Sequence, residues 1–197
     1  MSADKQTLDF YDGAAAEYAG KFARTEPDQS LNAFMEAIPA GGMVLDFGCG
    51  PGNTAAILAE HGFEVEATDA SQGMADLAKQ KFGLDVRVES FGDLQETAKY
   101  DGIWANFSLL HAPRAEMPQN LDNVHKALKP KGIFHLGLKI GDRDVRDHLD
   151  RFYTLYEEDE LRGLLDAAGF TITSVRRGRE RGMAGTLDPF IIILSHA

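Results

Sequence analysis

The chain contains one cysteine, Cys49, among its 197 residues, and it therefore forms no internal disulfide. Its fold does not depend on an oxidising compartment, and zinc sites built from four thiolates are excluded. The six histidines are scattered, without a His-x3-His or His-Glu-x2-His pair, so no metal site is expected. Cys49 lies between two glycines, where a small side chain filling a tight turn is preferred over a catalytic thiol.

Long apolar runs are also absent. The stretch from Phe190 to Leu194 is far shorter than the ~20 residues that a membrane-spanning helix needs, so no membrane partner is expected. The first residues lack the basic-then-apolar order of a signal peptide, which favours a cytoplasmic location. A length of 197 residues, with 44% hydrophobic and 26% charged residues, is typical of one globular domain, so residues 1–197 are interpreted as a single domain.

Positive charge is scarce, because 20 Lys and Arg residues stand against 31 Asp and Glu, a net charge of −11. A field of this sign repels phosphate backbones, which argues against a nucleic-acid partner. The local exception is the basic run of Arg176, Arg177, Arg179 and Arg181. A solvated loop between two strands is the preferred interpretation of this run, and an anion site is the alternative left open.

Short strand-like runs alternate with helical stretches from residue 43 onward, which is typical of a parallel α/β sheet with helices on both faces. The predicted strands are 43–47, 63–68, 86–88, 102–107, 133–138, 170–175 and 188–194, and the predicted helices are 53–61, 72–82, 117–128 and 157–168. The last two strands are joined without a helix and are expected to pair antiparallel. Residues 1–42 are expected to form a helical cover over the open edge of this 43–197 core.

A glycine-rich loop follows the first predicted strand in Val44-Leu45-Asp46-Phe47-Gly48-Cys49-Gly50-Pro51-Gly52. Ligands of doubly wound sheets bind at the carboxyl ends of the strands, and glycines let the backbone turn sharply and approach a ligand. The dinucleotide fingerprint Gly-x-Gly-x-x-Gly requires a glycine at position 53, which is Asn53 here. The spacing therefore disfavours a nicotinamide-dependent oxidoreductase, which is kept as a weaker alternative.

Asp69 ends the second predicted strand, 69 − 48 = 21 residues after the first glycine of the loop. A carboxylate at this position can accept hydrogen bonds from both hydroxyls of an adenosine ribose. Its other interpretation is an N-cap for the following helix, a role that Ser71 can also take. Both roles can coexist.

The Gly-x-Gly-x-Gly loop, preceded by Asp46 and followed by Asp69, resembles the first motifs of class I (Rossmann-like) S-adenosylmethionine-dependent methyltransferases. Ala127–Ile133 resembles the "LKPGG" turn of that family, with Lys131 in place of a glycine, and the segment from Phe10 to Tyr18 resembles its opening helix. The resemblance covers almost the whole chain and is strongest to small bacterial enzymes of unassigned substrate. It implies a seven-stranded mixed sheet in the order 3-2-1-4-5-7-6, with strand 7 antiparallel.

The resemblance also implies the cofactor, S-adenosyl-L-methionine, with S-adenosyl-L-homocysteine as its product. Asp93 is expected to accept a hydrogen bond from the adenine amino group, and Asn106 is open to the cofactor or the acceptor. The residues expected to bind the cofactor are Tyr11, Tyr18, Asp46, Gly48, Cys49, Gly50, Gly52, Asp69, Ala70, Phe91, Gly92, Asp93 and Asn106.

The acceptor is expected to be a small molecule that attacks the methyl carbon directly. The segment from Asn106 to His111 lacks the Asn/Asp-Pro-Pro-aromatic motif of enzymes that act on nucleic-acid bases or protein amides. His111 is either a general base or a brace for the following loop, and a base is needed only when the acceptor must lose a proton. Lys139, Arg151 and Tyr153 are expected to line the acceptor pocket, where the two cations suit a carboxylate. A cofactor-binding protein without catalysis remains the alternative function.

Overall fold

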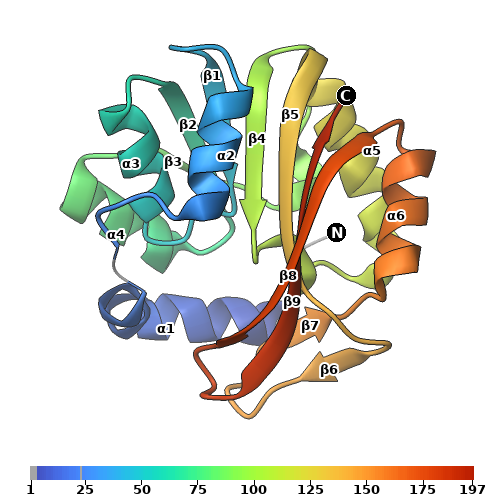
Figure 1. The fold of residues 1–197 in the computed structure, drawn as a ribbon. Helices are drawn as coiled ribbons and strands as arrows, with labels where there is room; N and C mark the ends of the chain where they lie inside the picture. The colour runs from blue at the N-terminus through green and yellow to red at the C-terminus, as the bar shows by residue number, and fades with distance from the viewer. Residues whose placement is uncertain (1–3, 23) are drawn as a thin grey trace.

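A seven-stranded sheet forms the centre of the computed structural model, which describes residues 4–22 and 24–197 (Figure 1). The sheet consists of β1 (Met43–Phe47), β2 (Glu64–Asp69), β3 (Val86–Val88), β4 (Tyr100–Asn106), β5 (Leu128–Lys139), β8 (Thr171–Arg181) and β9 (Leu187–His196). Their spatial order is β3-β2-β1-β4-β5-β9-β8. The first five strands run parallel, and β9 pairs antiparallel with both β5 and β8. The order and the antiparallel last strand confirm the expected fold class.

Both faces of this sheet are buried beneath helices, as expected for parallel strands. The helices are α1 (Lys5–Lys21), α2 (Gln29–Ala37), α3 (Asn53–Glu60), α4 (Gln72–Phe82), α5 (Met117–Ala127) and α6 (Glu158–Ala167). Successive residues of β1 point to opposite faces, so Val44 packs with α2 and α3 while Leu45 packs with the cluster that includes α5 and α6.

The two N-terminal helices do not cover an edge of the sheet, and this expectation was wrong. Helix α2 packs on one face, where Phe34 contacts Trp104 at a ring-centroid distance of 5.3 Å. Helix α1 runs beneath the carboxyl ends of the parallel strands (Figure 1). Its Asp12 carboxylate accepts hydrogen bonds from the Ser71 hydroxyl at 2.6 Å and from the Gly73 amide at 2.9 Å, which ties α1 to the start of α4.

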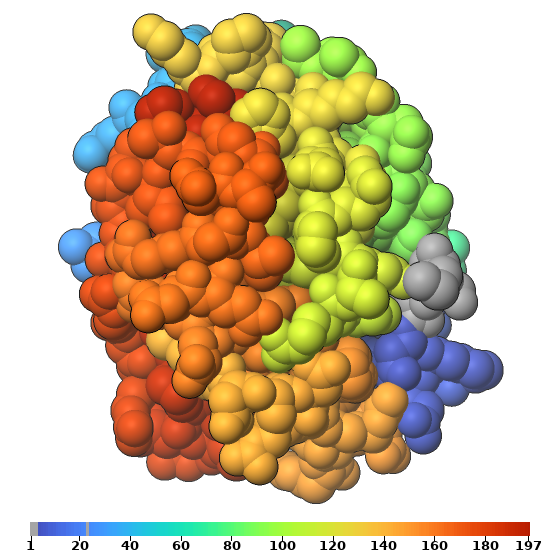
Figure 2. All heavy atoms as spheres, turned by 90° about the vertical axis from the view of Figure 1, so that its right-hand side faces the viewer, coloured from blue at the N-terminus to red at the C-terminus, as the bar shows by residue number. Residues whose placement is uncertain are grey.

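A two-stranded hairpin, β6 (Asp144–Arg146) and β7 (Phe152–Thr154), was not predicted. Its strands have three residues each, too few for an apolar alternation to mark them in the sequence, and β6 carries two charged side chains. Figure 2 shows this segment beneath α5 and α6 and beside α1. The hairpin thus places another wall near the strand ends, next to α1.

The basic run from Arg176 to Arg181 belongs to β8 and is not a loop, which corrects the sequence interpretation. Because β8 is the edge strand, its outward side chains reach solvent and charge is tolerated there. Arg177 pairs with Glu158, and Arg176 donates to the Ser30 hydroxyl at 2.8 Å. These arginines therefore already have partners within the fold.

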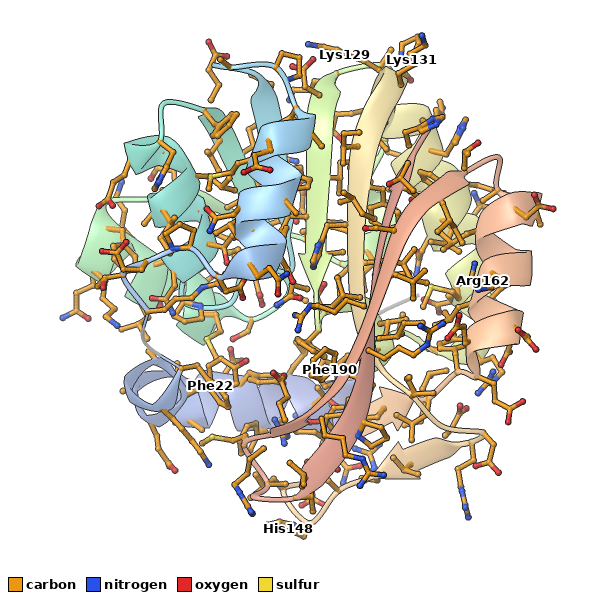
Figure 3. The ribbon with its side chains drawn as sticks, viewed as in Figure 1. Phe22, Lys129, Lys131, His148, Arg162 and Phe190 are labelled. Carbon is orange, nitrogen blue, oxygen red and sulfur yellow. The ribbon has the colours of Figure 1, made fainter. Side chains whose placement is uncertain are left out.

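The amino ends of the parallel strands lie far from α1. Figure 3 shows Lys129 and Lys131 at that end, opposite Phe22 and Phe190. Lys131 has a φ of +64°, a conformation that favours glycine, at the position where the resembled turn has a glycine. Among the helices of the described residues, none combines the length and apolar character that a bilayer crossing requires.

Candidate active site

A cavity of about 360 Å³ lies between α1 and the carboxyl ends of the central strands. Tyr11 and Tyr18 of α1 line it from one side, and the glycine loop after β1 lines it from the other. Of the residues expected to bind cofactor or acceptor, those that line this cavity are Tyr11, Tyr18, Asp46, Gly48, Cys49, Gly50, Asp69, Ala70, Phe91, Asn106, His111, Lys139, Arg151 and Tyr153. The fold therefore gathers most of these residues around one space.

The glycines of the loop have different roles. Gly48 and Gly50 have φ values of +79° and +53°, which side chains rarely adopt. A Cβ at Gly48 would lie 2.3 Å from the Ser108 Cβ, whereas one at Gly50 would meet no atom within 4 Å. Gly52 does not line the cavity, and a Cβ there would lie 2.8 Å from Leu84 Cδ1. Gly52 thus permits close packing against the Leu84 side chain. Gly50 instead exposes its backbone to the cavity.

Asp69 joins the glycine loop to the end of β2. One carboxylate oxygen accepts from the Gly50 amide at 2.8 Å and the other from the Ser71 amide at 2.9 Å. Ser71 is the N-cap of α4, because its hydroxyl accepts from the Met74 amide at 3.1 Å. Burial raises the pKa of Asp69, and the two backbone donors oppose that effect. Each oxygen keeps a further lone pair for a donor in the cavity.

A carboxylate and a guanidinium lie near each other beside the glycine loop. Asp46 is 2% exposed, and its Oδ2 has no hydrogen-bond partner among the described residues. Burial raises the pKa of Asp46 to about 7, and the charge of Arg24 opposes this shift. Arg24 lines the same cavity and donates to the Thr54 hydroxyl at 2.6 Å and to Asp28 at 2.9 Å. This pair can hold the ammonium and carboxylate groups of an amino acid.

Sequence reasoning did not identify Arg24. It lies in the connection between α1 and α2, and neither a motif nor a helical spacing marks it. Only the packing of that connection against α3 brings its side chain beside Asp46.

The thiol of Cys49 lines the cavity but does not resemble a catalytic nucleophile. Burial raises its pKa, and the neighbouring carboxylates of Asp46 and Asp69 add to the shift, so the thiol stays protonated. Phe91 offers an aromatic wall, held against Phe47 at a ring-centroid distance of 5.0 Å. Cys49 therefore presents a small neutral side chain to a ligand, and Phe91 presents a flat apolar surface.

Asp93 and its neighbour Gly92 do not line the cavity. The Asp93 carboxylate accepts from the Ser90 amide at 2.9 Å and from the Ser90 hydroxyl at 2.7 Å, which forms a capping box for the short 3₁₀ helix Phe91–Asp93. These two hydrogen bonds lower the pKa of Asp93. The local turn therefore engages the carboxylate, and Ser90 and Phe91 line the cavity at this point of the chain.

Both ring nitrogens of His111 have partners. Nδ1 lies 2.6 Å from the carbonyl oxygen of Phe152, and Nε2 lies 2.9 Å from the hydroxyl of Tyr11. A carbonyl only accepts, so Nδ1 carries the proton and Nε2 accepts from Tyr11. Burial lowers the pKa of His111 to about 4, and the charges of Arg151 and Lys139 act in the same direction. The ring is therefore neutral at pH 7, with a fixed tautomer.

The two cations expected to attract a carboxylate are already neutralised by neighbouring carboxylates. Lys139 pairs with Asp188 at 2.7 Å, and Arg151 pairs with Asp147 at 2.6 Å. Both also lie over the ring of Tyr153, at 4.3 and 5.3 Å from its centroid. These cations shape the cavity wall but carry little uncompensated charge, so the geometry does not favour an anionic acceptor.

Asn106 is held by a residue that sequence reasoning did not consider. Its amide oxygen accepts from His135 Nε2 at 3.0 Å, and the His135 ring stacks on Trp104 at 3.5 Å. This hydrogen bond fixes the orientation of the Asn106 amide and leaves the two N–H donors of its nitrogen for a ligand. Within the ranges 4–22 and 24–197, no group of three His, Cys, Asp or Glu side chains could hold a metal ion.

Comparison with known proteins identifies the family. Residues 19–175 match a family described as "Methyltransferase domain". The chain belongs to this family. Putative methyltransferase YqeM of Bacillus subtilis is 28% identical over 143 residues, covering 67% of this chain and 58% of that protein. The S-adenosyl-L-methionine-dependent Diels-Alderase iccD of Talaromyces variabilis is 33% identical over 125 residues, covering 55% of this chain and 42% of that protein.

A solved structure agrees with this assignment at the level of the fold. The 1,6-didemethyltoxoflavin-N1-methyltransferase of Burkholderia thailandensis superposes with a TM-score of 0.71 and 24% identity, covering all of this chain and 91% of that one. That structure contains S-adenosylhomocysteine and 1,6-didemethyltoxoflavin. The chain spans about half the length of these two curated relatives. Family membership and this superposition together confirm the class I methyltransferase fold, and they agree with the S-adenosylmethionine cofactor expected from the glycine loop and Asp69.

Proposed function

We propose that this chain transfers a methyl group from S-adenosylmethionine to a small, uncharged acceptor by direct displacement. The observation that carries the proposal is one cavity lined both by the Asp69–Gly50 contact and by the Tyr11–His111 pair. The first suits the nucleoside of the donor, and the second offers proton-accepting groups to an acceptor. The net charge of −11 and the paired cations of the cavity support an acceptor that is neither a nucleic acid nor an anion.

The residues present fit the cofactor. Asp69 suits the two ribose hydroxyls, while Arg24 and Asp46 suit the carboxylate and ammonium of the methionine part. The unpartnered Oδ2 of Asp46 supports this placement, because a buried carboxylate oxygen is costly without a donor. When bound, S-adenosylmethionine supplies a methyl group on a positively charged sulfur, which departs as a neutral thioether.

Helix α1 closes the site. Tyr11 and Tyr18 pack edge to face at 5.5 Å and line the cavity, so α1 shields the reacting groups from water. Positioning of two reactants in a closed space accounts for a large part of catalysis when the donor is already activated. Most of the chemistry assigned to the chain is therefore orientation.

The Tyr11–His111 pair supplies a route for a proton when the acceptor is a hydroxyl group. As the acceptor oxygen bonds to the methyl carbon, its proton passes to Tyr11 Oη, and the proton of Tyr11 passes to His111 Nε2. His111 would then hold the positive charge that S-adenosylmethionine brings when bound, so charge would be conserved. An acceptor with no proton to lose needs only the orientation that the cavity provides.

Two measurements test the proposal. Thermal unfolding with S-adenosylhomocysteine, S-adenosylmethionine and NAD in parallel should show stabilisation by the first two alone, and stabilisation by NAD alone would overturn the cofactor assignment. A panel of phenols, alcohols, amines, thiols and carboxylates, each with S-adenosylmethionine, should give S-adenosylhomocysteine with a neutral acceptor. Cofactor binding without turnover on any class would instead favour a binding protein, or a relative of iccD that uses the cofactor differently.

A further inference from the structure

Glu116 has a buried oxygen for which the chain supplies no donor. It is the N-cap residue of α5 and lines the cavity, and its Oε1 is enclosed without a hydrogen-bond partner among the described residues. The nearby cation, Arg114, pairs with Glu160 and Asp144 and donates to the Leu155 carbonyl. A buried carboxylate oxygen without a donor costs free energy, so this oxygen suits a donor that arrives with a ligand.

The donors of the cofactor identify a partner for that oxygen. S-adenosylmethionine carries an ammonium group, two ribose hydroxyls and the adenine amino group. Asp46 suits the first and Asp69 the second, and these residues lie at the carboxyl ends of the neighbouring strands β1 and β2, Asp46 one residue before the end of β1. Only the adenine amino group is then left without a carboxylate.

Glu116 begins a helix that packs beside the segment after β3, next to the strand that carries Asp69. Helix α5 packs against the 3₁₀ helix Phe91–Asp93, which follows β3, the strand beyond β2. Both Phe91 and Glu116 line the cavity. An adenine base needs a flat apolar neighbour for its ring and an acceptor for its amino group.

We propose that Glu116 Oε1 accepts the hydrogen bond from the adenine amino group, in the place that the sequence motif assigned to Asp93. The proposal rests on S-adenosylmethionine as the cofactor. Asp93 is exposed, outside the cavity and engaged by Ser90, so its carboxylate is bound to its own turn. The discrimination between adenine and other bases then comes from the start of α5.

Isothermal titration with two ligands tests this assignment without an acceptor. S-inosylhomocysteine differs from S-adenosylhomocysteine in carrying a carbonyl oxygen where adenine has its amino group. A carboxylate facing that oxygen repels it, so the protein should bind S-adenosylhomocysteine more tightly by about 10- to 100-fold. In Glu116→Gln the amide can accept from the amino group or donate to the carbonyl, and the ratio of the two dissociation constants should fall to within about 3-fold of one.

Asp93→Asn is the matched control, because it removes the same charge from the residue that the motif indicates. Its ratio should equal that of the unchanged protein, and the ratio is insensitive to a partial loss of folded protein. The inference is overturned if Glu116→Gln keeps the original ratio, if Asp93→Asn collapses it, or if the unchanged protein does not discriminate. Failure of the unchanged protein to bind S-adenosylhomocysteine at all would overturn the proposed function as well, which separates the two results.

Discussion

The hydroxyl of Tyr11 lies 2.9 Å from Nε2 of His111, and this contact joins the first helix to the loop after β4 across 100 residues of sequence. The Phe152 carbonyl holds the opposite ring nitrogen at 2.6 Å, so the tautomer of His111 is fixed. His111 therefore braces β7 and presents a neutral nitrogen to Tyr11 at the same time. The two roles that the sequence left open for His111 are compatible in one geometry.

Tyr11→Phe removes the hydroxyl that connects His111 to the cavity. With a hydroxyl acceptor, turnover should fall by about 100-fold, because the proton route is lost while orientation remains. Binding of S-adenosylhomocysteine should change by less than about 3-fold. The measurement is S-adenosylhomocysteine formation together with titration calorimetry.

Tyr156→Phe is the control for this variant. The Tyr156 hydroxyl is buried in the core and has no hydrogen-bond partner among the described residues, so its removal should leave turnover unchanged. Equal turnover in Tyr11→Phe and Tyr156→Phe would contradict a role of Tyr11 in proton transfer.

Asp69→Ala removes the carboxylate proposed for the ribose. The affinity for S-adenosylhomocysteine should fall by about 100-fold or more, because two charge-assisted hydrogen bonds are lost. Ser71→Ala removes the cap of α4 and the hydrogen bond to Asp12 instead, and should lower the free energy of unfolding by about 1 to 2 kcal/mol with a much smaller change in affinity than Asp69→Ala. Calorimetry and urea unfolding separate the two effects. Unchanged affinity in Asp69→Ala would mean that Asp69 only ties the glycine loop.

Asp46→Asn tests the buried carboxylate through its pH dependence. The pKa of Asp46 is raised to about 7, so between pH 4 and 7 the folded protein keeps a proton that the unfolded chain has lost. This group therefore lowers the stability of the ligand-free protein progressively as the pH rises from about 4 to 7. Asp46→Asn has no carboxyl group at this position and does not lose stability in this way. Its free energy of unfolding should exceed that of the unchanged protein by little near pH 4.5 and by roughly 2 kcal/mol at pH 8.

Urea unfolding of both proteins from pH 4.5 to 8.5 measures this difference. Saturation with S-adenosylhomocysteine should reverse its sign at pH 8, because the carboxylate then has an ammonium partner. A difference that does not vary with pH would show that Asp46 does not titrate in this range.

Gly48→Ala and Gly62→Ala separate a steric clash from backbone strain. Both glycines have left-handed φ values, +79° and +87°, so each substitution costs about 1 kcal/mol of strain. At Gly62 a Cβ meets no atom within 4 Å, whereas at Gly48 it would lie 2.3 Å from the Ser108 Cβ. Gly48→Ala should therefore lose a further 2 kcal/mol or so of stability in urea unfolding. Equal losses would mean that Ser108 moves aside freely.

The elements with strong local signals were predictable. Helix α4 begins and ends at the predicted residues, because Ser71 caps its start and Gly83 adopts the left-handed conformation at its end. Strand β1 also has the predicted bounds, since both faces are buried and the run is apolar. The β6–β7 hairpin had no such signal, because its residues are held by contacts such as that of the Phe152 amide with the Thr7 hydroxyl at 2.8 Å.

The same division applies to the site. Gly48, Gly50 and Asp69 were found because their spacing reflects a local strand–loop–helix unit and the strand beside it. Arg24 and Glu116 come from segments without a motif and reach the cavity only through packing. Asp93 matched a motif but is bound to Ser90, because a hydrogen bond within its own turn competes with any ligand.

By itself the sequence determined the α/β fold and the glycine loop, because these depend on periodicity, capping and the short-range spacing of residues on adjacent strands. The nature of the cofactor followed from the family resemblance that the loop and Asp69 carry. Tertiary structure alone decided that α1 closes the strand ends, that Lys139 and Arg151 are neutralised by carboxylates, and that Tyr11 meets His111. Each of these results depends on the distance between segments far apart in the chain. Hydrophobic pattern and local propensity do not encode such distances.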